Sequence, residues 1–236
     1  MREAGRVVAE VLDLLKGMIE PGITTAELDQ AADKHILARG AKPGFKGLYG
    51  FPYTICASIN EQVVHGFPSL RKLENGDIIS IDVGAEINGY FCDHASTYKV
   101  GEIVSETQKL LNVTRESLME GINVARNGAR LSDISNAVQT YVEKNGFSVV
   151  RDYVGHGIGT KMHEDPPIPN FGKPGRGPRL KTGMTLAIEP MVNMGSYHVQ
   201  TLLDKWTVVT RDGQPSAHFE HTIVVTENEP VVLTLP

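Results

Sequence analysis

Hydrophobic residues recur at every third or fourth position in four stretches of the chain, which is the spacing of amphipathic helices. In the first stretch they stand at Ala4, Val7, Val8, Val11, Leu12 and Leu15. Pro21 and Gly22 break this pattern, and the pair Thr24 and Glu27 has the spacing of a capping box that starts a second helix. Gly40 is placed to end that helix, so the chain is expected to open with two helices.

The same succession recurs after Gly101. Ser105 and Gln108 have capping-box spacing and predict the start of a long helix that ends before Gly128. A fourth helix is expected to end at Gly146, and its apolar face is formed by Ile134, Val138, Tyr141 and Val142.

Residues 77–98 follow the two-residue period of β-strands instead. Polar or small residues alternate there with an apolar set made of Ile79, Ile81, Val83, Ala85 and Ile87. The dipeptide Asn88-Gly89 favours a type I′ turn, which would place Gly84 opposite Asp93 in a hairpin. Asp82 and Asp93 would then point to the same side of the hairpin, about 7–8 Å apart.

The two halves of the chain share a fixed offset. Five pairs of similar residues lie 106 positions apart: Gly22 and Gly128, Glu27 and Asp133, Leu28 and Ile134, Ala31 and Ala137, and Gly40 and Gly146. Segments 76–82 and 183–189 align at an offset of 107, which makes Asp82 equivalent to Glu189 and suggests Glu220 as the counterpart of Asp93. A shared displacement indicates an internal duplication, so we expect a single catalytic domain over residues 1–236, with halves of about 1–100 and about 101–236.

Each half thus has two helices followed by a strand and a hairpin. Because the helices come in pairs before the strands, the chain does not have the alternating pattern of a Rossmann-type sheet. We expect an α+β fold in which two pseudo-symmetric halves surround a central mixed or antiparallel sheet. The helices should cover one face of that sheet, and the functional site should lie on the other.

Composition narrows the class of protein. The chain is 41% hydrophobic and 22% charged, which is ordinary for a globular protein, and its net charge of −5 gives no argument for nucleic acid or an anionic membrane. No apolar run approaches transmembrane length, and the acidic residues Glu3, Glu10 and Asp13 do not suit a signal segment, so a cytoplasmic location is expected. Cys56 and Cys92 are expected to be two buried thiols.

The four carboxylates at the repeat positions need a physical reason to converge. On a solvated sheet face they would need none, and that alternative remains open for Asp82 and Asp93 considered alone. If they are buried together, their repulsion is relieved by a shared proton, a basic partner or a metal. His156, flanked by Gly155 and Gly157, completes an oxygen-rich set with one imidazole, which suits two divalent ions of Mn, Fe, Co or Zn.

Other features have a structural and a functional interpretation side by side. His65 follows an apolar run and is either a core or loop histidine or a site residue. Residues 165–178 form a loop rich in proline and glycine that is either a plain connection or the wall of a cleft. Trp206, the single tryptophan, is expected on a strand and in the core.

Together these residues resemble the type I methionine aminopeptidases, dinuclear metallopeptidases of the pita-bread fold. The matching segments are spread in order over nearly the whole chain, at 50–52, 56–61, 65–66, 80–84, Asp93, 155–159, His163, 188–191 and 219–222. By this resemblance the sequence starts inside the usual first helix of the family, so a few residues upstream of Met1 are expected.

The resemblance implies a role for each polar residue of the set. Asp82 would bind one metal ion, and Asp93 and Glu220 would bridge two. His156 and Glu189 would complete the ligand set of the other ion. A metal-bound water or hydroxide would attack the scissile carbonyl, with Glu189 as the candidate general base.

The resemblance also implies substrate contacts. His163 would stabilise the developing oxyanion, and His65 would assist near the first peptide bond. The slot for the methionine side chain would include Phe51, Cys56, Met162 and Trp206. The sequence departs from the family pattern at three positions, since Leu48 and Met162 stand where the family often has aromatic residues and His218 stands where it commonly has Gln.

The expected activity is removal of the N-terminal methionine from peptides and nascent chains, preferably before a small second residue. The expected enzyme is a cytoplasmic monomer with the ribosome as a candidate partner, and with no membrane and no specific nucleic acid as partner. One alternative is a peptidase of the Xaa-Pro aminopeptidase or prolidase type, which usually carries an N-terminal domain for which 236 residues leave no room. A second alternative is a non-catalytic binding module on this fold, which predicts lost ligands and a basic surface.

Overall fold

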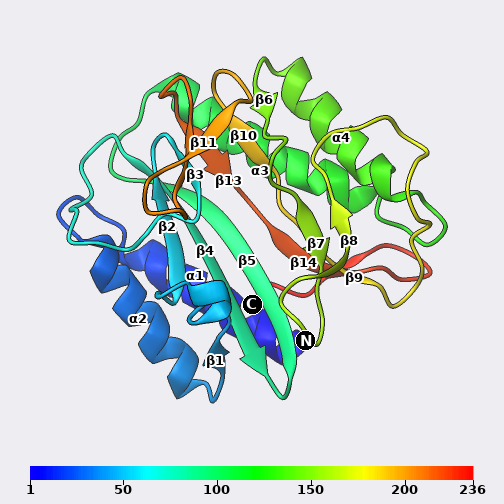
Figure 1. Cartoon of the computed structure of the whole chain (residues 1–236), viewed down its shortest axis with the longest axis horizontal. Helices are drawn as coiled ribbons and strands as arrows, with labels where there is room; N and C mark the ends of the chain where they lie inside the picture. The colour runs from blue at the N-terminus through cyan, green and yellow to red at the C-terminus, as the bar shows by residue number, and fades with distance from the viewer. Residues whose placement is uncertain (236) are drawn as a thin grey trace.

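Figure 1 shows the computed structural model of the chain, which describes residues 1–235. The chain runs through four α-helices, one 3₁₀ helix and fifteen strands within those residues. The helices are α1 (Arg2–Met18), α2 (Thr25–Ala38), η1 (Leu48–Gly50), α3 (Ser105–Asn123) and α4 (Leu131–Lys144). The strands are β1 (Lys42–Pro43), β2 (Ile55–Ile59), β3 (Gln62–Val64), β4 (Ile78–Ile87), β5 (Tyr90–Lys99), β6 (Ser148–Val149), β7 (Gly155–Gly157), β8 (Glu164–Ile168), β9 (Thr185–Ile188), β10 (Met191–Asn193), β11 (Val199–Thr201), β12 (Val208–Thr210), β13 (Ser216–His218), β14 (His221–Val224) and β15 (Val231–Val232).

The hairpin β4–β5 forms with the predicted register. Gly84 pairs with Asp93 and Asp82 with Ala95, and Asn88 and Gly89 both have positive φ, as a type I′ turn requires. Helix α1 packs its predicted apolar face against both strands, and α2 lies beside α1 (Figure 1). Burial of this face and of the hairpin's apolar side builds the core of the first half.

The strands of the second half are shorter than their counterparts in the first. The counterpart of β4 is divided into β9 and β10 at Glu189 and Pro190, since proline has no N–H to continue a ladder. The counterpart of β5 is likewise divided into β13 and β14, with Glu220 in the gap. Both Glu189 and Glu220 therefore lie at strand ends instead of within strands.

Both predicted helix starts are confirmed, but the capping box forms only at α2. Thr24 caps α2, because its backbone N–H donates to Glu27 Oε2 at 2.8 Å while its hydroxyl accepts from the Glu27 N–H at 3.2 Å. Ser105 is instead the first residue of α3 and makes no side-chain cap, so the capping box with Gln108 does not form. Gly40 and Gly146 end α2 and α4 with positive φ, as expected.

Equivalent hydrogen bonds in the two halves support the internal repeat. Gly22 N–H donates to the Leu73 carbonyl at 2.8 Å, and its counterpart Gly128 N–H donates to the Leu180 carbonyl at 2.9 Å. The same holds at the strand starts, where the N–H groups of Gly76 and Gly183 donate to the carbonyls of Val100 and Val225, both at 2.9 Å.

The register corrects one predicted equivalence. Asp82 and Glu189 occupy equivalent positions, since β4 pairs with β5 and β9 pairs with β14 in matching registers. Ala95 pairs with Asp82, so Glu220, opposite Glu189, is the counterpart of Ala95. The counterpart of Asp93 is His218, and the prediction that Asp93 and Glu220 are equivalents is wrong by two residues.

The two halves join where β5 runs beside β13 and β14. Glu220 N–H donates to the Ala95 carbonyl at 2.9 Å. The Thr97 hydroxyl donates to the His218 carbonyl and accepts from the His218 N–H. The helices lie on one side of the strands, behind them in Figure 1, so the opposite face of this junction is free to carry a site. Across residues 1–235, no helix combines the length and apolarity that crossing a membrane demands.

Candidate metal centre and active site

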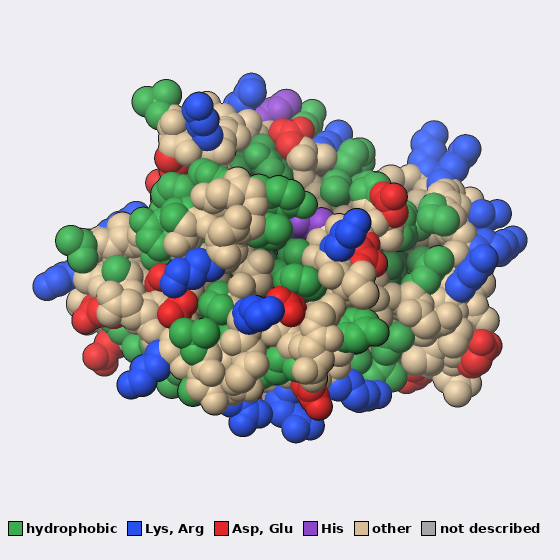
Figure 2. All heavy atoms as spheres, turned by 60° about the horizontal axis from the view of Figure 1, so that its bottom comes forward, with side chains coloured by type: hydrophobic (Ala, Val, Ile, Leu, Met, Phe, Trp, Pro, Cys, Tyr) green, Lys and Arg blue, Asp and Glu red, His purple; other side chains and the backbone are tan. Residues whose placement is uncertain are grey.

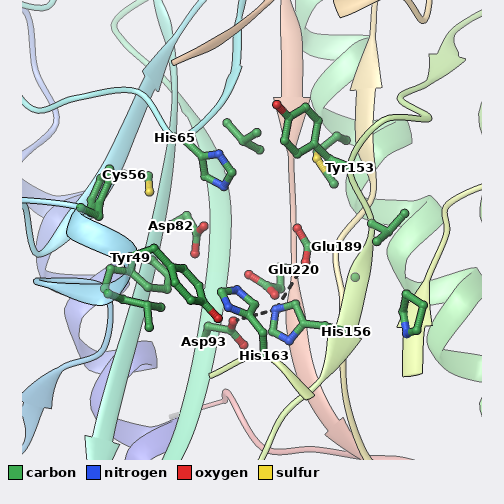
Figure 3. A pocket seen from close by; sticks show the side chains of 18 of the residues that line it. Tyr49, Cys56, His65, Asp82, Asp93, Tyr153, His156, His163, Glu189 and Glu220 are labelled. Atoms are coloured by element: carbon green, nitrogen blue, oxygen red, sulfur yellow. Dashed lines mark ion pairs between the residues drawn. The ribbon is translucent and has the colours of Figure 1, made fainter. Parts of the chain in front are cut away.

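A cavity of about 520 Å³ opens on the strand face at the junction of the two halves. Figure 2 shows histidine atoms in a hollow bordered by hydrophobic side chains, and Figure 3 shows the side chains that line the cavity. Ten of the eleven site residues predicted from sequence line it: Phe51, Cys56, His65, Asp82, Asp93, His156, His163, Glu189, Trp206 and Glu220.

Met162 is the predicted residue that the structure places elsewhere. Its side chain is 2% exposed and packs behind the cavity wall, close to Gly44 and Gly84. Phe45 lies in the same cluster and does line the cavity. Met162 therefore shapes the pocket from behind.

Four carboxylates converge on the cavity floor from different strands. Asp82 comes from β4, Asp93 from β5, Glu189 from the end of β9 and Glu220 from the residue before β14 (Figure 3). Asp82 Oδ1 and Glu220 Oε1 are buried and accept no hydrogen bond from the residues described. Desolvation, and after it the neighbouring carboxylate charges, raise the pKa of both Asp82 and Glu220 well above their ordinary values.

His156 faces these carboxylates in one defined orientation. Its Nδ1 lies 2.8 Å from the Gly157 carbonyl oxygen, so Nδ1–H donates there and Nε2 is directed to the carboxylates. Nε2 lies 3.3 Å from Asp93 Oδ2 and 3.6 Å from Glu189 Oε1. Burial acts to lower the pKa of His156, but the charges of Asp93 and Glu189 outweigh it and raise the pKa to about 9.

The glycines around His156 serve the strand, not a ligand. His156 belongs to β7, which lies between β8 and β9. A Cβ on Gly155 would collide with the Ala187 carbonyl oxygen, and one on Gly157 with the Asp165 carbonyl oxygen. The glycines therefore let neighbouring backbones approach closely enough to fix the position of His156.

The donor set fits divalent cations. Ligand atoms of Asp93, His156 and Glu220 all lie within 4.8 Å of one another, and the unpartnered oxygens of Asp82 and Glu220 need a positive charge nearby. Thr222 steadies this arrangement, because its hydroxyl lies 3.0 Å from Asp93 Oδ1 and holds the carboxylate from behind. Oxygen ligands with one imidazole suit borderline and hard divalent metals.

The other end of the cavity is apolar. Phe51 is 3% exposed and contacts Trp206 edge-on, with ring centroids 5.1 Å apart. Trp206 precedes β12 in a turn held by Asp204, so the expectation that it lies on a strand is wrong. Cys56 is buried in this wall, and Cys56 and Cys92 are both free thiols, as expected.

His65 and His163 lie between the carboxylates and the solvent. His65 has a left-handed backbone with φ of 59° and touches Tyr153 and Trp206 edge-on. Burial lowers the pKa of His65 to about 4, which keeps its imidazole neutral. Partial desolvation and the neighbouring His156 also lower the pKa of His163. Both rings can therefore act as neutral hydrogen-bond donors.

Several lining residues escaped the sequence interpretation. Phe45 and Tyr49 precede the 50–52 segment and Tyr153 precedes the 155–159 segment, so their proximity to these motifs was the available signal, and Met191 is the last residue of the matched segment 188–191. Residues 165–168 of the predicted proline-rich loop belong to β8, and Asp165 and Pro167 of that strand line the cavity. Residues 172–177 turn away and bond to α4 instead, so only the start of this loop forms a wall.

Comparison with known proteins places this geometry in a family. The pattern described as "Metallopeptidase family M24" matches residues 1–227. The chain is 59% identical over 235 residues to a methionine aminopeptidase of Clostridium perfringens, covering 100% of this chain and 94% of that protein. It is 47% identical to the crystal structure of a methionine aminopeptidase from Thermotoga maritima, with a TM-score of 0.99, covering 100% of this chain and 95% of that one.

A more distant solved structure shares the fold alone. The prolidase of Pyrococcus furiosus is 22% identical with a TM-score of 0.79, and this chain spans 62% of its length. The expected α+β pita-bread fold is thus confirmed. From the match over residues 1–227 and these identities, the chain belongs to metallopeptidase family M24.

Proposed function

We propose that this protein is a metal-dependent aminopeptidase that removes the N-terminal methionine from peptides and newly made chains. The observation that carries the proposal is the cavity itself, which joins a floor of buried carboxylates and His156 to an apolar end walled by Phe51, Cys56 and Trp206. The relatives at 47–59% identity are methionine aminopeptidases over essentially their whole length. Such substrates are made in the cytoplasm, which we propose as the place of action.

We propose that the floor holds two divalent ions of Mn, Fe, Co or Zn. Asp82, Asp93, His156, Glu189 and Glu220 would supply the ligands. When bound, such ions polarise a carbonyl group and lower the pKa of water. The chain contributes the orientation of its ligands, since Thr222 holds Asp93 and the Gly157 carbonyl fixes the tautomer of His156.

The remaining polar residues would handle the peptide bond. Glu189 would accept a proton from the attacking water, and its place at a strand end leaves one side of its carboxylate toward the cavity. His163 would donate a hydrogen bond to the carbonyl oxygen as negative charge develops there. His65, neutral and held beside Trp206, would contact the first peptide group.

The methionine side chain would enter the apolar end. Phe51, Trp206 and Cys56 form walls there, and Met162 supports Phe45 from behind. A flexible thioether adapts to such a slot and gains favourable contacts with aromatic edges. The whole chain would thus act as one catalytic domain, with both halves supplying ligands and walls.

The test is a substrate comparison with the metal-stripped protein, with and without added Mn(II). We expect metal-dependent release of methionine from Met-Ala-Ser, weak release from Leu-Ala-Ser and none from a Leu-Pro peptide. Cleavage of the proline peptide alone would assign the prolidase-type activity instead. No cleavage of any peptide despite bound metal would leave a binding module on this fold and would refute the proposal.

A further inference from the structure

Tyr49 has an unusual conformation for an exposed aromatic residue. It is 74% exposed at the mouth of the cavity, and its backbone adopts the left-handed region with φ of 50° and ψ of 19°. A bulky residue in this region pays a conformational cost that surrounding structure must compensate. Strain of this kind at the rim of an active site is a reason to look for a task.

The backbone around Tyr49 is held by a tight set of hydrogen bonds. Gly47 N–H donates to the Phe51 carbonyl at 2.7 Å, and Phe51 N–H donates to the Leu48 carbonyl at 2.9 Å. Gly47 and Gly50, with φ of 88° and 89°, make the reversals on either side of the turn. Phe51, buried in the apolar wall, anchors this turn, so the Tyr49 ring has a defined direction despite its exposure.

That direction is toward His163. The two rings stack with centroids 5.8 Å apart and planes inclined by 19°, and Figure 3 shows Tyr49 extending from η1 over His163. On its other side His163 meets His156 edge-on at 4.5 Å. Among residues 1–235, no side chain or backbone group makes a hydrogen bond with the His163 ring. The ring contacts with Tyr49 and His156 therefore help to set its orientation.

We propose that Tyr49 is a positioning residue that fixes the plane of the His163 imidazole for its bond to the substrate carbonyl oxygen. This inference rests on the proposed function, in which His163 stabilises the oxyanion. A donor must be aimed at the oxyanion before the charge develops, and a ring free to rotate loses part of that benefit. The strained turn holds Tyr49 so that its stacking keeps His163 aimed.

The stacking role predicts which variants retain activity. Tyr49→Phe keeps the ring and should keep kcat within about twofold of wild type. Tyr49→Gly removes the ring and should lower kcat about two- to tenfold, the range that one aromatic pair contributes, with little change in KM. Because glycine adopts the left-handed region without strain, the thermal midpoint of Tyr49→Gly should equal or exceed that of wild type. If Tyr49 only stabilised the fold, Tyr49→Gly would lower the thermal midpoint below that of wild type.

A double-mutant cycle tests whether Tyr49 acts through His163. His163→Ala should cost about a hundred- to a thousandfold in kcat, which leaves turnover measurable at high enzyme concentration. In that background Tyr49→Gly should have no further effect. Equal losses from Tyr49→Phe and Tyr49→Gly, or a full additional loss in the His163→Ala background, would overturn the inference.

All variants are assayed on Met-Ala-Ser with Mn(II) added to saturation. The matched control is Tyr90→Ala, an exposed tyrosine on the hairpin outside the cavity, which should leave kcat unchanged. A wild-type protein that released no methionine would refute the proposed function. Active wild type with an unaffected Tyr49→Gly would refute only the role of Tyr49.

Discussion

Glu220→Gln should make the metal-free protein more stable while destroying its response to metal. Glu220 is 2% exposed, its Oε1 has no hydrogen-bond partner among the residues described, and it shares the floor with three other carboxylates. Desolvation, followed by the charges of Asp93, Glu189 and Asp82, raises the pKa of Glu220. Without a cation, ionisation of this carboxyl therefore works against the folded state.

The size of the effect follows from the geometry. Ligand atoms of Glu220 and Asp93 lie within 4.8 Å, and two full charges at that distance repel by about 3.5 kcal/mol at an effective dielectric constant of 20. The gain in stability is expected to be smaller than this repulsion, because the wild-type protein relieves part of it by taking up a proton. We expect Glu220→Gln to gain about 1–3 kcal/mol in unfolding free energy at pH 8.

The gain should depend on pH in a defined direction. The folded-state pKa of Glu220 lies above its ordinary value of 4.5. The wild type therefore loses stability as pH rises from about 4.5 toward the raised pKa of the folded state. The difference between Glu220→Gln and wild type should thus be small near pH 5 and grow toward pH 8. Added Mn(II) should stabilise wild type and leave the variant nearly unchanged.

The difference in unfolding free energy between Glu220→Gln and wild type is measured by urea unfolding of the metal-stripped proteins, followed by circular dichroism at pH 5 and pH 8. Glu102→Gln is the matched control, since the Glu102 side chain is 89% exposed and should change stability by less than about 0.5 kcal/mol. A Glu220→Gln protein that is less stable than wild type without metal would refute the reasoning. The charge of Glu220 would then not destabilise the metal-stripped protein.

Two further changes test the packing around the site. His94 is buried and stacked on His221 with ring centroids 4.3 Å apart, and burial lowers the pKa of His94 to about 4. The stability that neutral His94 contributes is therefore present above pH 6.5 and lost as pH falls toward 4. Between pH 7.5 and pH 4, metal-free wild type should lose about 3 kcal/mol more unfolding free energy than His94→Phe, and parallel pH profiles of the two proteins would contradict this. The Cβ that Gly84→Ala adds would lie 2.5 Å from Met162 Cε and 2.8 Å from Phe45 Cε1. This overpacking should lower the free energy of unfolding in urea by about 1–3 kcal/mol and raise KM for Met-Ala-Ser. Unchanged values of both would show that the cavity wall is loosely packed.

The β4–β5 hairpin could be predicted to the residue, because its determinants are local. The two-residue period sets which side chains face the core, and Asn88-Gly89 fixes the register. The helices could be placed for the same reason, including the start of α3 at Ser105, although the capping contact that its spacing predicted does not form. The offset of 106 positions was visible in the sequence because Gly22 and Gly128 make matching turns, and their matching hydrogen bonds support the predicted repeat.

The finer details of the site depend on contacts between distant parts of the chain. Glycines beside His156 could accommodate a ligand or a neighbouring strand, and only the close approach of Ala187 and Asp165 distinguishes the two. Met162 matched a pocket position in sequence, yet the side chain that lines the cavity is Phe45, which packs in the same cluster as Met162. The stack of Tyr49 on His163 joins residues far apart in the chain, which no local pattern signals.

The central claim is that the carboxylate–imidazole floor is the metal centre of a methionine-releasing enzyme. The most direct measurement is the rate of methionine release from Met-Ala-Ser by metal-stripped protein as Mn(II) is added, with wild type and Asp82→Asn compared. We expect activity from wild type that rises with Mn(II) and saturates, and at most a small residual rate from a folded Asp82→Asn protein. Release by wild type without metal, or an undiminished rate in Asp82→Asn, would contradict the claim.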